Sequence, residues 1–144
     1  MLIFRNPLGS AYIELPKKLR SPMIINIQNS DNYCFAWCVL AYLHPAKDHS
    51  KRVSNYEPYT NELNVEGINF PSHLVDIEKF QLQNVALVSV NVYELSESNK
   101  ISKVFISHNN PKGCNLLCYG YHYVLCKDIS IYYRHSKYHK AYPC

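Results

Sequence analysis

One segment of the chain, YCFAWCVLAYLHP at residues 33–45, is apolar at nearly every position. Its apolar residues recur at helical spacing and Pro45 closes the run, which predicts a helix that is buried on most sides. The polar NSDN at residues 29–32 is typical of a turn and can cap the start of that helix. We therefore expect a helix at the centre of the domain, with Cys34 in its first turn.

The rest of the chain predicts an α+β domain. A second helix is expected at residues 74–83, and strands are expected at residues 23–28, 85–95, 103–109, 114–120 and 121–128, where β-branched and aromatic residues are frequent. Because the helix-rich part comes first, we expect a central N-terminal helix packed on a C-terminal antiparallel sheet. Residues 1–22 predict an irregular lead-in, residues 23–133 the folded domain, and residues 134–144 a basic tail.

The composition indicates whether the chain folds, where it is located and in what state its cysteines are expected. Hydrophobic residues make up 47% and charged residues 18% of the 144 residues, which predicts a folded domain rather than a disordered chain. The chain has no stretch of ~18 apolar residues and no continuous apolar core of a secretory signal, so we expect an intracellular protein that binds no membrane. Its six cysteines are then expected as thiols, metal ligands or a nucleophile rather than as disulfides.

Cys34 is the first candidate for chemistry. A cysteine attacks as the thiolate, and the partial positive charge at a helix start favours that form. His122, which opens the strand after Gly120, is the best-placed imidazole to take the thiol proton. Gln28 lies six residues before the cysteine and can donate to a developing oxyanion together with the backbone N–H of Cys34.

This pattern resembles the arrangement of papain-like cysteine peptidases. With Asn32 and Trp37 close to the cysteine, it also resembles the Cys box of ubiquitin-specific proteases. The glycines that usually surround the papain-type cysteine are absent. The resemblance implies a papain-like fold in which Cys34 is the nucleophile, His122 the base and Gln28 an oxyanion donor.

Papain-like peptidases also orient the imidazole with a third residue, usually from an element after the histidine strand. Asp128 is the only Asp or Asn after His122 and is therefore the candidate. On one straight strand Asp128 would share the face of His122 but lie about 20 Å away. A contact between them would need a bend, or the partner would be another residue such as Asn109 or Asn115.

Two other interpretations of the cysteines stay open. Free cysteine is among the most buried residue types, so Cys34 can be a packing residue, as we expect Cys38 to be one turn later. The like-spaced pairs Cys34/Cys38 and Cys114/Cys118 offer four thiolates to zinc. Residues four apart on a strand lie about 13 Å apart, which is too far for one ion.

Over nearly its full length the chain resembles a family of uncharacterised arthropod proteins derived from mobile elements or viruses. The likeness rests on segments such as INIQNSDNYCFAWCVLAYLHP, RVSNYEPYTNELNVEGINFP and HYVLCKDIS. In that family the domain often precedes a zinc finger that opens Y-x-C-x-x-C, and sometimes a family-B DNA polymerase region. The resemblance implies that Cys144, in KAYPC, is the first ligand of such a finger.

Cofactor and partner expectations follow from this resemblance. Within the 144 residues we expect no cofactor, because His135, His139 and Cys144 make an incomplete set of ligands. Zinc would belong to a longer chain, and nucleic acid would be a partner of its C-terminal part.

Two functional hypotheses remain. The first is a thiol peptidase or isopeptidase that acts on a protein or peptide, active or with its activity lost. The second is a non-catalytic module that docks a protein or nucleic acid for the polymerase of a mobile element.

Overall fold

The computed structural model describes residues 11–107 and 113–132. Asn109, the basic tail, and within that tail His135, His139 and Cys144, lie outside the described residues. In chain order, the elements are η2 (Lys17–Leu19), β1 (Ile24–Ile25), α1 (Cys34–Leu43), η3 (Val53–Asn55), η4 (Glu57–Glu62), α2 (Leu74–Gln83), β2 (Val90–Leu95), β3 (Ile101–Ile106), β4 (Cys114–Tyr119) and β5 (His122–Cys126). The α+β class is therefore confirmed.

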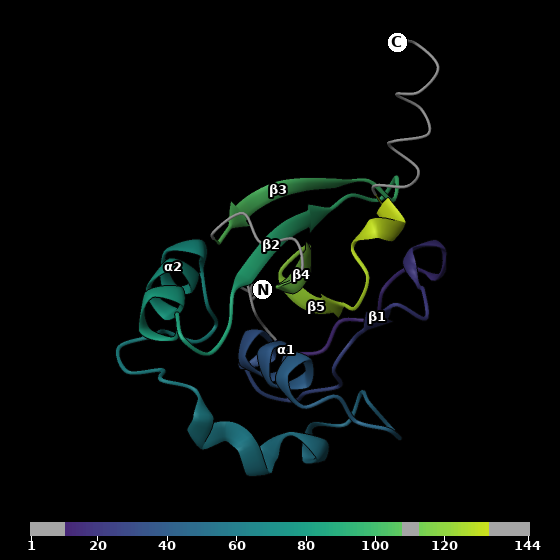
Figure 1. The fold of residues 1–144 in the computed structure, drawn as a ribbon. Helices are drawn as coiled ribbons and strands as arrows, with labels where there is room; N and C mark the ends of the chain where they lie inside the picture. Colours follow the sequence, from purple (N-terminus) through teal and green to yellow (C-terminus); the bar gives the residue numbers. More distant parts are fainter. Residues whose placement is uncertain (1–10, 108–112, 133–144) are drawn as a thin grey trace, which may run out of the picture.

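The five strands form one sheet in the order β1-β5-β4-β2-β3 (Figure 1). Three of the four strand pairs are antiparallel, but β2 and β4 are parallel. The expectation of a purely antiparallel sheet is therefore wrong. The reason lies in the hairpin of β2 and β3, which brings the chain back to the end where β2 began, so that β4 starts there and runs in the same direction as β2.

The core has two parts, one on each face of the sheet. Helices α1 and α2 cover one face, where Phe35 packs edge-on against Phe80 of α2 at 5.0 Å between ring centroids (Figure 1). The opposite face is covered by the N-terminal segment through Leu15 and Leu19, and by Ile129 after β5. Because both faces are covered, strands such as β4 are buried along nearly their whole length.

Both predicted α-helices are confirmed at α1 and α2, but β3 begins two residues before the predicted residue 103, and the other four strands are shorter than predicted, two of them by several residues at one end. Of residues 23–28 only Ile24 and Ile25 form a strand, and residues 85–89 precede β2 instead of belonging to it. The buried amide of Gln81 accepts from the N–H of Val90 at 2.6 Å and donates to the carbonyl of Val88 at 2.7 Å. This side chain takes up backbone groups that a strand partner would otherwise bind, so regular pairing begins only at β2.

The segment between α1 and α2 forms the short 3-10 helices η3 and η4. His44, at the end of α1, stacks on Tyr59 at 3.7 Å between ring centroids, and its Nε2 lies 2.7 Å from Oε1 of Glu62. In the part of the chain that the structure describes, no helix has the length and apolar character needed to cross a membrane.

Candidate active site

Cys34 is the first residue of α1, and its thiol lies against the backbone of β5. The Tyr123 N–H donates to Cys34 Sγ at 3.5 Å, and Cys38 Sγ donates to the Tyr123 carbonyl at the same distance. Backbone N–H and C=O groups point sideways, in the plane of a sheet. The two thiols of α1 therefore contact the backbone edge of β5, beyond the two β5 residues that pair with β1. Cys34 therefore lies beside the backbone of Tyr123, and within the described ranges no hydrogen bond joins its thiol to Nδ1 of the neighbouring His122.

The surroundings of Cys34 favour the protonated thiol. Its side chain is 0% exposed, and burial raises the pKa of the Cys34 thiol from its ordinary value of 9.0 to about 12. The N–H of Tyr123 lowers that pKa, whereas nearby Cys118 and the carboxylate of Asp31 raise it further. Desolvation thus outweighs the helix N-terminus, which the sequence led us to expect to favour the thiolate.

Asp31 contributes to the raised pKa of Cys34. Its Oδ1 accepts from the N–H of Tyr33, directly before α1, at 3.0 Å and from the indole Nε1 of Trp37 at 3.0 Å. These contacts fasten the preceding turn to α1, but the N-cap residue is Tyr33 and no side-chain cap hydrogen bond forms, so the cap predicted at residues 29–32 is wrong. The same carboxylate places a negative charge beside the helix start, which opposes ionisation of Cys34.

His122 opens β5, as predicted, directly after a tight hairpin. Gly120 has φ of +61°, the left-handed conformation that such a turn takes up most easily at a glycine. The His122 side chain is 1% exposed, and the ring of Tyr12 lies edge-on to it at 6.2 Å between centroids. The hairpin and the surrounding residues therefore hold the imidazole in one place.

Asn26 is the hydrogen-bond partner of His122. Its Oδ1 lies 2.7 Å from His122 Nε2, and its Nδ2 donates to the carbonyl of Ile13 at 2.9 Å. Because the amide nitrogen donates to Ile13, the amide oxygen accepts and Nε2 of the imidazole carries the proton. In the neutral ring this leaves Nδ1 as the basic nitrogen.

Asn26 is a site residue that was not predicted from the sequence. The only local signal was a polar side chain in the otherwise apolar run MIINI, in a segment predicted to be a strand. Such a residue needs a polar partner. The pairing of β1 with β5 brings that partner from 96 residues further along the chain.

Gln28 lies just after Asn26 on the same segment. Its backbone N–H donates to the carbonyl of Lys51 at 2.8 Å, and it forms an isolated bridge with Arg52. Its side chain is exposed, and within residues 11–107 and 113–132 the Gln28 amide has no hydrogen-bond partner. The backbone position of Gln28 is therefore held, while its amide is open to a ligand.

The proposed third residues lie elsewhere. Asp128 follows β5 at the end opposite His122, and its Oδ1 accepts from the N–H of Ser130 at 3.0 Å and from the hydroxyl of that serine. Asn115 accepts from Asn91 Nδ2 at 2.9 Å between β4 and β2. The structure therefore brings Asn26, not Asp128 or Asn115, to the imidazole.

The cysteine pairs do not assemble as the zinc interpretation requires. Burial raises the pKa of Cys38 and of Cys114, and Cys118 lies on the partly exposed end of β4. No cluster of three or more His, Cys, Asp or Glu side chains that could hold a metal ion occurs among the described residues. In this part of the chain the cysteines are packing residues or, for Cys34, a candidate nucleophile.

Comparison with known proteins gives no match. No family model, no curated protein and no solved structure matches the chain.

Proposed function

We propose that this chain is a papain-like thiol peptidase or isopeptidase domain of a mobile-element protein. The observation that supports the proposal is the bond between Asn26 and His122, which leaves Nδ1 as the basic nitrogen of the imidazole one residue before Tyr123, whose backbone N–H donates to Cys34 Sγ. No hydrogen bond joins His122 Nδ1 to Cys34 Sγ among the described residues, so the reaction requires the two side chains to approach each other. A thiol at a helix start, an imidazole at a strand start and an amide that orients the imidazole are the parts that such a peptidase uses. Here the orienting amide comes before the cysteine in the chain, in contrast to the usual papain-like order.

The reaction follows from these roles. As Cys34 Sγ attacks the carbonyl carbon of the scissile amide, its proton passes to Nδ1 of His122, and a carbon–sulfur bond forms. The carbon–nitrogen bond then breaks, and the imidazolium gives its proton to the leaving amine. Water, deprotonated by the imidazole, hydrolyses the thioester, and the proton returns to the thiol as the carboxylic acid leaves.

Gln28 and the Cys34 backbone N–H are the proposed donors to the oxyanion. Each tetrahedral step places negative charge on the former carbonyl oxygen, which such donors stabilise. The exposed amide of Gln28, on a backbone held by Lys51, fits this role. Because the pKa of Cys34 is about 12, the attack needs His122 to remove the proton in the same step.

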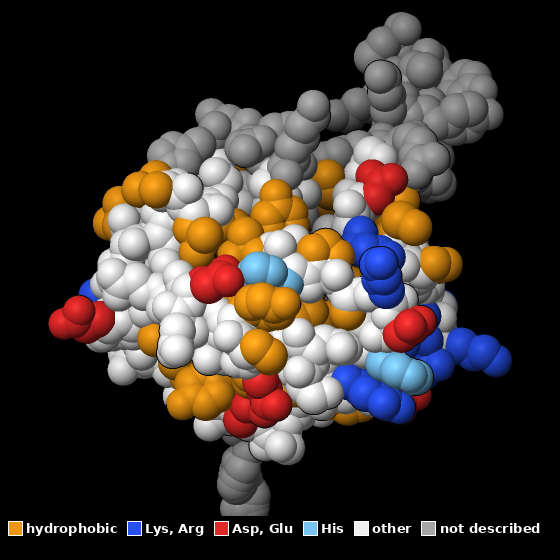
Figure 2. All heavy atoms as spheres, turned by 60° about the horizontal axis from the view of Figure 1, so that its bottom comes forward, with side chains coloured by type: hydrophobic (Ala, Val, Ile, Leu, Met, Phe, Trp, Pro, Cys, Tyr) orange, Lys and Arg blue, Asp and Glu red, His pale blue; other side chains and the backbone are white. Residues whose placement is uncertain are grey.

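The burial of Cys34 favours a second candidate function, a non-catalytic docking module. A side chain that is 0% exposed cannot be reached by a peptide carbonyl unless neighbouring groups move. A domain that retained the fold and lost the chemistry would act as a docking module for a protein or a nucleic acid. Figure 2 shows Lys and Arg side chains along the right-hand side of one face, with Asp or Glu side chains among them, and an acidic partner would bind there.

A thiol-reactive probe on a peptide or on ubiquitin tests the peptidase. We expect the wild-type chain to be labelled, Cys34→Ala not to be labelled, and Cys118→Ala, which removes a partly exposed thiol, to be labelled like the wild type. His122→Gln should reduce labelling at least tenfold while its urea unfolding midpoint shows that it still folds. Equal labelling of wild type and Cys34→Ala would refute the nucleophile and leave the docking module.

A further inference from the structure

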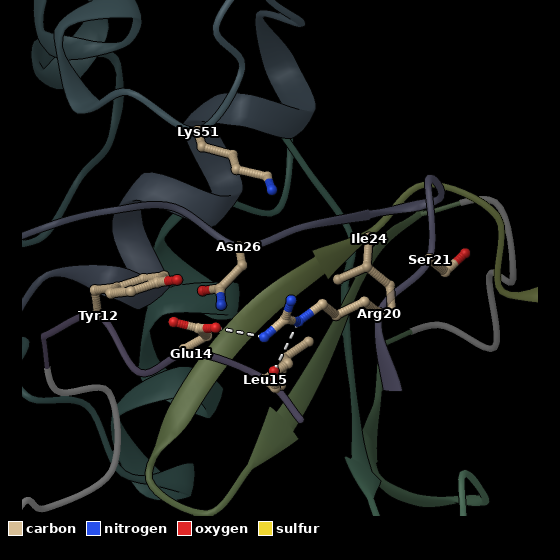
Figure 3. Close-up of a pocket in the computed structure, with 8 residues that line it drawn as sticks. All are labelled: Tyr12, Glu14, Leu15, Arg20, Ser21, Ile24, Asn26 and Lys51. Atoms are coloured by element: carbon tan, nitrogen blue, oxygen red, sulfur yellow. Dashed lines mark hydrogen bonds and ion pairs between the residues drawn. The ribbon is translucent and has the colours of Figure 1, made fainter. Parts of the chain in front are cut away.

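A hollow of about 220 Å³ lies beside the candidate site (Figure 3). Its wall includes Tyr12, Glu14, Arg20, Asn26 and Lys51, and we call it the Lys51 pocket. Figure 3 shows the Lys51 ammonium on one side and the Glu14–Arg20 pair on the other, with the Asn26 amide between them. The pocket therefore contains the positive charge of Lys51 and, separately, the ion pair of Glu14 and Arg20.

Three contacts connect the Lys51 pocket to the site. Asn26 lines the pocket and also accepts from His122 Nε2. Tyr12 lines the pocket and lies edge-on to the same imidazole. The Lys51 carbonyl accepts from the backbone N–H of Gln28, which fixes the lysine next to the proposed oxyanion donor.

The charges of the pocket favour an anion. Glu14 forms an ion pair with Arg20, whose Nε also donates to the carbonyl of Leu15 at 2.9 Å. Lys51 makes no ion pair with any residue in the ranges 11–107 and 113–132. One net positive charge remains, on an ammonium that is open to a ligand, while the carboxylate of Glu14 would repel a chain of many phosphates.

We propose that the Lys51 pocket binds a carboxylate on the amine side of the scissile bond, such as an acidic side chain of a peptide substrate. The inference rests on the proposed peptidase function. In that mechanism His122 gives a proton from Nδ1 to the leaving amine. Asn26 holds the other ring nitrogen, Nε2, and Tyr12 lies edge-on to the ring, and both also line the pocket, so a substrate that extends past the imidazole on its amine side reaches Lys51.

Binding can be measured without catalysis. The Cys34→Ala chain is titrated with N-acetylglutamate methylamide and with the matching glutamine compound, and amide shifts are followed by NMR. We expect the acidic compound to bind about two- to fivefold more tightly at low salt, the range of an exposed ion pair. Lys51→Gln should abolish the difference, whereas Lys51→Arg and the surface control Lys103→Gln should keep it.

Cleavage of a mixed peptide library by the chain with Cys34 intact gives the second measurement. We expect Asp and Glu to be enriched on the amine side of the cleaved bonds, and Lys51→Gln to remove that enrichment. Cleavage without enrichment, together with equal binding of both compounds, would overturn the pocket and leave the peptidase. Binding that depends on Lys51 without cleavage would support the pocket and overturn the peptidase. Tighter binding of a DNA oligonucleotide, lost in Lys51→Gln, would overturn the peptide carboxylate as the ligand.

Discussion

Alkylation of Cys34 should be about a thousandfold slower in the folded protein than in the unfolded chain at pH 8. The thiol pKa rises from its ordinary value of 9.0 to about 12 on folding, and only the thiolate reacts, so the reactive fraction falls by roughly that factor. The dominant cause is desolvation of a side chain that is 0% exposed, and the Asp31 carboxylate adds to it. A slow resting thiol is compatible with the proposed reaction, in which His122 removes the proton only as the substrate is attacked.

The assay is iodoacetamide labelling followed by mass spectrometry, over a series of pH values from about 6 to 10. The unfolded reference is the same chain in concentrated urea, and Cys34→Ala identifies the labelled peptide. The folded rate should rise about tenfold for each pH unit with no plateau, because the thiolate fraction does so below the pKa. A plateau below pH 8, or a folded rate within tenfold of the unfolded one, would show a resting thiolate paired with an imidazolium and refute the desolvation argument.

Two further predictions concern stability. Asn26→Ala should lower the free energy of unfolding by about 2–4 kcal/mol in urea titrations, because it leaves the His122 ring N–H and the Ile13 carbonyl without their amide partner. Asn55→Ala, which removes exposed bonds, should cost less than about 1 kcal/mol, and equal costs would contradict the assignment. The protein should also lose stability as the pH rises above about 9. In the folded state burial raises the pKa of Cys34 to about 12 and that of Cys126 to about 11. Above pH 9 the folded chain therefore still holds protons that the unfolded chain has lost, and this favours unfolding. Each such thiol lowers the free energy of unfolding by about 1.4 kcal/mol per pH unit until the pH reaches its folded pKa. Urea unfolding midpoints that do not change between pH 8 and 10 would contradict the burial of these thiols.

The sequence by itself determined the elements that carry the candidate nucleophile and base. The apolar run after the NSDN turn predicted α1 with Cys34 at its start, and the glycine before the HYVLC segment predicted β5 with His122 at its start. Both are local features, because the spacing of apolar residues and the conformational freedom of glycine act within a few residues. The same local reasoning placed α2 correctly at residues 74–83.

Only the tertiary structure decided how these elements meet. The partner of His122 is Asn26, 96 residues away, because β1 pairs with β5 at the edge of the sheet. The pKa of Cys34 depends on what covers α1, and the parallel pairing of β2 with β4 depends on the order of strands in the whole sheet. The pattern of a segment shows which of its faces must be buried, but it carries no information about which distant residue will cover that face.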